Sequence, residues 1–64
     1  MFKEYGIVYS NEKINDKVSY GTKGVIVMIL DKELPIFEVE FFDNDNEILD
    51  VTEVLGSQLK SLDV

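Results

Sequence analysis

The chain has no cysteine, histidine, arginine or tryptophan among its 64 residues, and it has a single proline. Without cysteine it forms no disulfide, and without cysteine and histidine it lacks the usual ligands of a structural zinc ion. A domain this short buries only about 60% of the surface that its unfolded chain exposes. We therefore expect it to depend on an efficient apolar core or on contact with another chain, with no cofactor.

The same absences limit the chemistry that the chain can perform. Its six basic residues are all lysines and stand against 13 acidic residues, which gives a net charge of −7. Nucleic-acid phosphates are bound by lysine and arginine, so we expect no nucleic-acid partner. The serine and threonine hydroxyls have no histidine base, and a domain this small offers little concave pocket around its carboxylates. We therefore expect a protein that is not an enzyme.

The apolar segments are short. The longest run, Val25 to Leu30, is far below the ~18 residues that cross a membrane. The N-terminal residues Met1 to Gly6 do not have the apolar run of a signal peptide. Absence of cysteine is typical of a reducing compartment. We expect one domain over residues 1–64, in the cytoplasm and not at a membrane.

Acidic residues are concentrated in one part of the chain. The segment from Glu38 to Glu53 has no lysine. Its seven carboxylates are Glu38, Glu40, Asp43, Asp45, Glu47, Asp50 and Glu53. Charge of one sign on a small ordered surface steers and selects a partner of the opposite sign. Outward carboxylates on a strand also serve solubility alone, and that alternative stays open.

Hydrophobic patterning predicts five short strands and no long helix. The predicted strands cover residues 5–10, 23–30, 36–42, 47–52 and 59–62. In the third, Phe37, Val39 and Phe41 alternate with Glu38 and Glu40, which predicts an apolar inner face and an acidic outer face. In the first strand we expect at least one of Tyr5 and Tyr9 in the core. In the fourth strand we expect Leu49 and Val51 to point inward, or Ile48 to pack on a neighbouring cover.

Turn signals separate these strands. Pro35 and the polar run from Asp43 to Asn46 mark tight turns. Residues 53–58 contain Gly56 and predict one short helical turn. Helical spacing between Val51 and Leu62 keeps a two-turn helix as an alternative. Five short strands with turn signals at this spacing favour a small barrel or sandwich.

Three segments, residues 18–27, 37–43 and 58–62, carry a family resemblance. Gly21 and Gly24 match a Gly-x-x-Gly turn, Glu38 to Phe41 match a Glu-Val-Glu-Phe strand, and Gln58 with the following leucine matches a closing Gln-Leu. This pattern resembles a family of short bacterial SH3-like barrels classed as a domain of unknown function. The resemblance implies an all-β, SH3-like five-stranded small barrel with one short helical turn, and no catalytic residues. The family usually carries glycine where Asn46 stands.

Other readings of these motifs fit less well. Asp43 to Glu47 has oxygen donors at the first, third and fifth positions of a calcium loop, but Ile48 and Val54 replace the glycine and glutamate that such a loop needs. Gly21 and Gly24 lack the longer glycine spacing of a phosphate-binding loop. Tyrosines 5, 9 and 20 leave an aromatic groove for a peptide as an alternative.

Apolar side chains exceed what one face of a small sheet can bury. Beyond the expected core, four apolar residues are left for a loop or another chain to cover: Ile26, Met28, Ile36 and Phe42. We hypothesise a non-catalytic acidic protein-binding module, such as a bacterial immunity protein or antitoxin. In this hypothesis the seven carboxylates and these four residues dock on a basic partner such as a nuclease toxin. The alternative is a structural or accessory barrel that acts through self-association.

Overall fold

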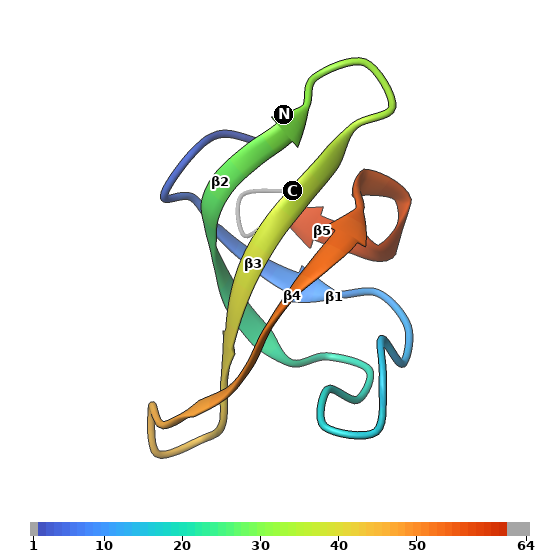
Figure 1. Ribbon diagram of the computed structural model, residues 1–64. Coiled ribbons are helices and arrows are strands. Elements are labelled where there is room, and N and C mark those ends of the chain that lie inside the picture. Colours follow the sequence, from blue (N-terminus) through green and yellow to red (C-terminus); the bar gives the residue numbers. More distant parts are fainter. Residues whose placement is uncertain (1, 62–64) are drawn as a thin grey trace.

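The computed structural model describes residues 2–61 as one antiparallel sheet with a short 3-10 helix (Figure 1). The elements are β1 (Ile7–Ser10), β2 (Lys23–Asp31), β3 (Ile36–Phe42), β4 (Ile48–Leu55), η1 (Gly56–Gln58) and β5 (Leu59–Ser61). The strand order is β4-β3-β2-β1-β5, so β4 and β5 form the two edges. In Figure 1, β2 and β3 are long and curved, and β1 and β5 run across them.

The all-β prediction is confirmed, and the helical turn is present as η1. The two-turn helix considered for residues 51–62 is wrong, because β4 continues to Leu55 and only η1 separates it from β5. Leu62, which both the helix and the last predicted strand included, lies outside the described residues.

β1 begins two residues later than predicted. Tyr5 has a φ of 65°, in the left-handed region, so the chain cannot be extended there. Val8 and Ser10 are buried, whereas Tyr5 is 72% and Ile7 39% exposed. The expectation that Tyr5 or Tyr9 lies in the core is therefore wrong, because the opposite face of the strand points inward.

A bulge in β2 changes which side chains point into the core. Ile26 pairs with Val39 and Met28 pairs with Glu38, so Val27 is an extra residue between two successive pairs. Ile26 is consequently 0% exposed on the inner face, and Met28 is 49% exposed on the outer face. The prediction that Ile26 contributes to a binding surface is wrong, because the core contains it completely.

The core lies on the inner face of the sheet and is closed by the loop before β2. Its buried apolar residues are Val8, Val18, Ile26, Phe37, Val39, Phe41, Val54 and Leu59. The predicted inward alternation of β3 is confirmed. Gly24 of β2 packs under β3, where an added Cβ would lie 2.7 Å from Val39 Cγ1 and 2.9 Å from Phe41 Cδ1. The close packing of β2 against β3 side chains therefore explains why position 24 is a glycine.

The loop of residues 11–22 is fixed by buried polar contacts. The Ser10 hydroxyl, 0% exposed, donates to the Ser19 carbonyl at 2.7 Å and accepts the Thr22 N–H at 2.8 Å. The Asn15 side-chain oxygen accepts the Val18 N–H at 3.0 Å. These bonds hold the loop so that Val18 reaches the core.

The turn between β3 and β4 forms as predicted, but in the strand after it the inward-facing and outward-facing residues are exchanged relative to the prediction. Asn46 has a φ of 63°, the left-handed conformation that asparagine tolerates after glycine. A register shift after Phe41 leaves Leu49 unpaired and places Asp50 opposite Phe41. Val51 is therefore 45% exposed and Val54 is the buried residue of β4. The expectation that Val51 points inward is wrong.

Candidate functional site: the outer face of the sheet

The outer face is the side of β1–β4 that points away from the core. Its residues are Ile7, Val25, Met28, Ile36, Glu38, Glu40, Val51, Glu53 and Leu55. The pairing aligns them in three rows across the strands, which are Ile7–Val25–Glu40–Val51, Met28–Glu38–Glu53 and Asp31–Ile36–Leu55. Asp31 ends β2, where its Oδ1 atom accepts two N–H groups of the following turn. The other three carboxylates lie among exposed and half-buried apolar side chains, with no lysine in any row. We call Glu38, Glu40 and Glu53 the central carboxylates.

Two of the central carboxylates face each other directly. The Gly56 N–H donates to the Pro35 carbonyl at 3.0 Å, which makes Ile36 and Leu55 a non-hydrogen-bonded pair. Antiparallel pairs alternate in type, so Glu38 and Glu53, two residues further along, also form a non-hydrogen-bonded pair. This is the pair type that brings side chains closest. The fold therefore places two acidic residues directly opposite each other on neighbouring strands.

The central carboxylates have no cation beside them. Among residues 2–61, the structure contains one ion pair, between Lys13 Nζ and Asp16 Oδ1 at 3.4 Å, on an exposed loop. Glu53 is exposed, and Glu38 and Glu40 are half-buried on the open face of β3. Their charge is therefore directed to solvent or to a partner.

The other predicted carboxylates lie elsewhere. Asp45 and Glu47 are exposed in the β3–β4 turn, and the Oδ1 atom of Asp43 accepts their backbone N–H groups at 2.8 and 2.9 Å. Asp43 thus stabilises the turn through its side chain. Asp50 points to the inner side of β4, where its Oδ2 atom accepts a bond from Asn15 Nδ2 at 2.9 Å. The seven carboxylates therefore do not form one surface.

The predicted apolar contact residues are also divided. Met28 is exposed on the outer face, and Ile36 is half-buried there beside Leu55. Phe42 is half-buried at the far end of β3, where it lines a hollow. Of the four residues, only Met28 lies in a row with central carboxylates, and Ile36 lies in the neighbouring row.

Sequence reasoning missed Val51 and Leu55 as outer-face residues. Both are exposed, at 45% and 47%, and they flank Glu53 along β4. The period-two pattern of Val51, Glu53 and Leu55 is present in the sequence. The predicted strand ends at Thr52, and the same residues also fit helical spacing, so the pattern alone does not identify this face.

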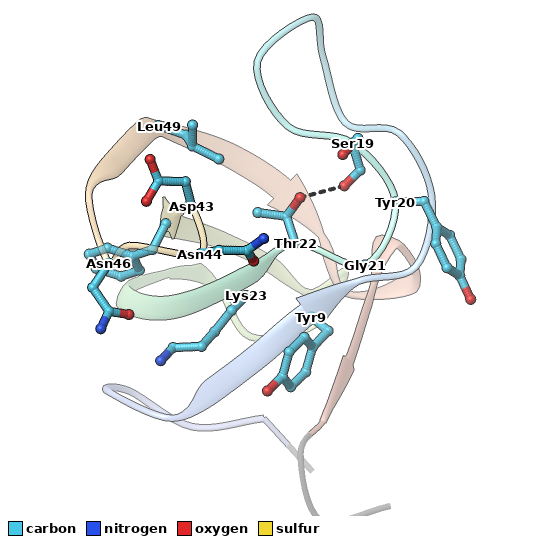
Figure 2. A pocket seen from close by; sticks show the side chains of 11 residues that line it. Tyr9, Ser19, Tyr20, Gly21, Thr22, Lys23, Asp43, Asn44, Asn46 and Leu49 are labelled. Atoms are coloured by element: carbon cyan, nitrogen blue, oxygen red, sulfur yellow. Dashed lines mark hydrogen bonds between the residues drawn. The ribbon is translucent and has the colours of Figure 1, made fainter.

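A hollow of about 510 Å³ lies between the β3–β4 turn and the loop before β2 (Figure 2). It is lined by Tyr9, Ser19, Tyr20, Gly21, Thr22, Lys23, Phe42, Asp43, Asn44, Asn46 and Leu49. Figure 2 shows Tyr9 and Lys23 extending from neighbouring strands, whereas Tyr20 points away from them. Tyr5 is not among the lining residues, so the three tyrosines do not form one groove.

Within residues 2–61, no three acidic side chains are grouped so that they could hold a metal ion. The calcium-loop interpretation of the turn gains no support, because Asp43 Oδ1 is occupied by two backbone N–H groups.

Within residues 2–61, no helix has the length and apolar character needed to cross a membrane.

Comparison with known proteins gives a family and no function. Neither the curated proteins nor the solved structures contain a match to this chain. The family DUF4926, described as a domain of unknown function, matches residues 4–61, which is nearly the whole sequence. The chain belongs to the DUF4926 family.

Proposed function

We propose that this protein is a non-catalytic protein-binding module whose outer face docks on a basic surface of another protein. The observation that carries the proposal is the directly opposed pair Glu38 and Glu53, with Glu40 in the adjacent row. Like charges directly opposite each other on a sheet destabilise it by a few tenths to about 1 kcal/mol. Folded domains of this kind have only about 5–15 kcal/mol of stability in total.

A basic partner would convert this unfavourable pair into a favourable contact. Lysine or arginine side chains placed between Glu38 and Glu53 would neutralise both carboxylates at once. Exposed Met28, Val51 and Leu55 surround the acidic centre and would add apolar contact area. This combination of apolar side chains and charge of one sign matches how protein interfaces obtain both affinity and selectivity.

A more specific form of the proposal is a bacterial immunity protein or antitoxin in the cytoplasm. In this form the acidic face covers the basic active site of a nuclease toxin. The small size and the net charge of −7 support it. We also propose that the sheet is an SH3-like barrel, an assignment supported by the strand order and by the 3-10 helix between β4 and β5.

One observation favours a second candidate, in which the protein is a structural module that self-associates. Met28, Val51 and Leu55 are 49%, 45% and 47% exposed on one face, and a second copy could cover them. Light scattering separates the two candidates. A dimer that dissociates on Met28→Glu favours self-association, whereas a monomer at high concentration contradicts it.

The proposed function is tested by calorimetric titration against basic nuclease toxins, starting with any encoded beside this gene. Binding should weaken steeply as salt rises from low to physiological concentration, because exposed charges are screened. Binding to a toxin that does not change with salt would contradict the proposal. So would the absence of binding to every basic protein tested at low salt.

A further inference from the structure

The edge strand β4 has an unpaired side. It lies at the end of the sheet order, with β3 on one side only. Among residues 2–61, no hydrogen bond joins the backbone of residues 48–54 to any element other than β3. The Leu55 N–H is already bonded to Gln58 Oε1 at 2.9 Å. Within the part of the chain that the structure describes, the backbone groups of the preceding residues on this side therefore have no partner.

The pair types identify which residues present these open groups. Leu55 is in a non-hydrogen-bonded pair with β3, so its own N–H points to the outside, where Gln58 meets it. By alternation, Glu53 and Val51 also direct their N–H and C=O groups away from β3. The same two residues place their side chains on the outer face. Val51 and Glu53 therefore offer a partner both unpaired backbone groups and outer-face side chains.

Only the first half of β4 carries features that block strand addition. Leu49 is an extra residue at the register shift, and the charged Asp50 points to the inner face. Bulges, inward charges, proline and charged side chains, lysine above all, protect sheet edges. Residues 51–55 have no bulge, inward charge, lysine or proline, and Val51 and Leu55 are exposed. Their one charged side chain, Glu53, opposes an acidic added strand but not a basic one. The open edge is therefore residues 51–55.

We propose that residues 51–55 accept an extended basic segment of a partner protein as a further strand of the sheet. The inference rests on the proposed function and adds the mode of binding. A segment paired with Val51 and Glu53 satisfies their open backbone groups. Its outer-face side chains would be a lysine or arginine opposite Glu53, with an apolar residue opposite Val51.

Two further features fit such a segment. A lysine or arginine opposite Glu53 is long enough to extend toward Glu38 on the next strand, so one cation meets both carboxylates of the opposed pair. A small hollow of about 160 Å³ lies at the end of the open edge. Its lining residues are Ile36, Glu53, Val54, Leu55 and Gln58. It offers a place for one apolar side chain of the added strand.

A second copy of β4 is a poorer occupant than a basic segment. No lysine occurs between Lys32 and Lys60, so β4 of another copy offers no cation to Glu53. Each copy also carries a net charge of −7. Charge complementarity therefore favours a basic chain of another protein.

The test uses the capped peptide Lys-Thr-Val-Thr-Lys-Thr-Val-Thr-Lys, in which lysine and valine alternate on one face of a strand. Two N-methylated isomers have the same charge and side chains. One is methylated on both valines and the central lysine, whose N–H groups face β4, and the other is methylated on threonines, whose N–H groups face away. The first isomer should bind about tenfold or more weakly than the parent, because it loses backbone hydrogen bonds to β4, and the second should retain binding.

Amide hydrogen exchange of the intact protein locates the bound strand. Exchange at Val51 and Glu53 should slow by about tenfold when the parent peptide is present in excess. The variant Val51→Pro removes an N–H that β3 does not use, so the fold is expected to tolerate it and peptide binding to be lost. Val51→Ala is the matched control, since it shortens the same side chain and keeps the N–H. If Val51→Pro does not fold, the hydrogen exchange of the unmodified protein and the two N-methylated peptides still show whether the peptide binds at the edge of β4.

The outcomes separate this inference from the proposed function. If both isomers bind as well as the parent and exchange at Val51 and Glu53 is unchanged, the edge is not the site, while salt-dependent binding keeps the proposed function. If none of the three peptides binds at low salt, both fail. If Val51 and Glu53 are protected without peptide in a particle of dimer mass, the occupant is a second copy and the inference is overturned.

Discussion

The two faces of β3 are built from alternate residues of one seven-residue strand and have opposite relations to stability. On the inner face, Val39 and Phe41 are 0% exposed and belong to the apolar core. On the outer face, Glu38 and Glu40 lie beside another carboxylate with no cation in the same rows. The inner face is arranged for packing, whereas the outer face keeps a repulsive pair that a small domain has reason to avoid. This difference supports the proposal that the outer face binds a partner.

The largest effect is expected from the inner face. Phe41→Ala removes a fully buried aromatic ring and should lower the free energy of unfolding by about 3–5 kcal/mol, most of the stability of a domain this small. Urea denaturation followed by circular dichroism measures the loss. Phe42→Ala, at the neighbouring half-buried position, is the control and should cost clearly less. Equal losses would contradict the division into two faces.

A smaller effect on the same face is expected from Gly24→Ala. The new Cβ would lie 2.7 Å from Val39 Cγ1 and 2.9 Å from Phe41 Cδ1, so overpacking should cost about 1–3 kcal/mol. Thermal unfolding detects it as a lower midpoint. Combining Gly24→Ala with Val39→Ala provides the space, so the double variant should lose less than the sum of the two single losses. Strict additivity would show that the close approach does not determine the cost.

The opposite sign is expected on the outer face. Glu53→Lys replaces the repulsive pair with Glu38 by an attractive one and should raise the free energy of unfolding by a few tenths to about 1 kcal/mol. The gain should shrink as salt is added. Glu33→Lys makes the same change in net charge on the exposed β2–β3 turn, without a cross-strand carboxylate, and should give a smaller gain. If both variants gain equally, net charge and not the opposed pair is responsible.

The inner face could be predicted from the sequence because β3 alternates without interruption. Phe37, Val39 and Phe41 are spaced by two, and the extra residue in this part of the ladder lies on β2 and not on β3, so the pattern translates directly into burial. The turn after β3 was also predictable, since asparagine and aspartate tolerate its backbone angles. These features depend on local chemistry.

The outer face could be predicted only in part, because three register shifts change its phase. The extra residue at Val27 moves Ile26 into the core and Met28 out of it, and the shift at Leu49 turns Val51 outward and Asp50 inward. A bulge leaves one residue of a strand without a paired residue on its neighbour. Its position depends on the neighbouring strand, so the periodicity of one strand does not reveal it. The acidic run was therefore visible as composition, but its division into a face, a turn and an inner contact was not.

The central claim is tested most directly by comparing a charge change on the outer face with an equal charge change elsewhere on the protein. The variant Glu38→Lys/Glu40→Lys and its control Glu4→Lys/Glu33→Lys each change the net charge by the same amount, and the control positions are exposed and lie outside the three rows. Affinity for the lysine-valine-threonine peptide is measured for both at low salt. The account predicts that the outer-face variant loses binding by about tenfold or more while the control stays near the unmodified protein. Equal affinities for the two variants would contradict it.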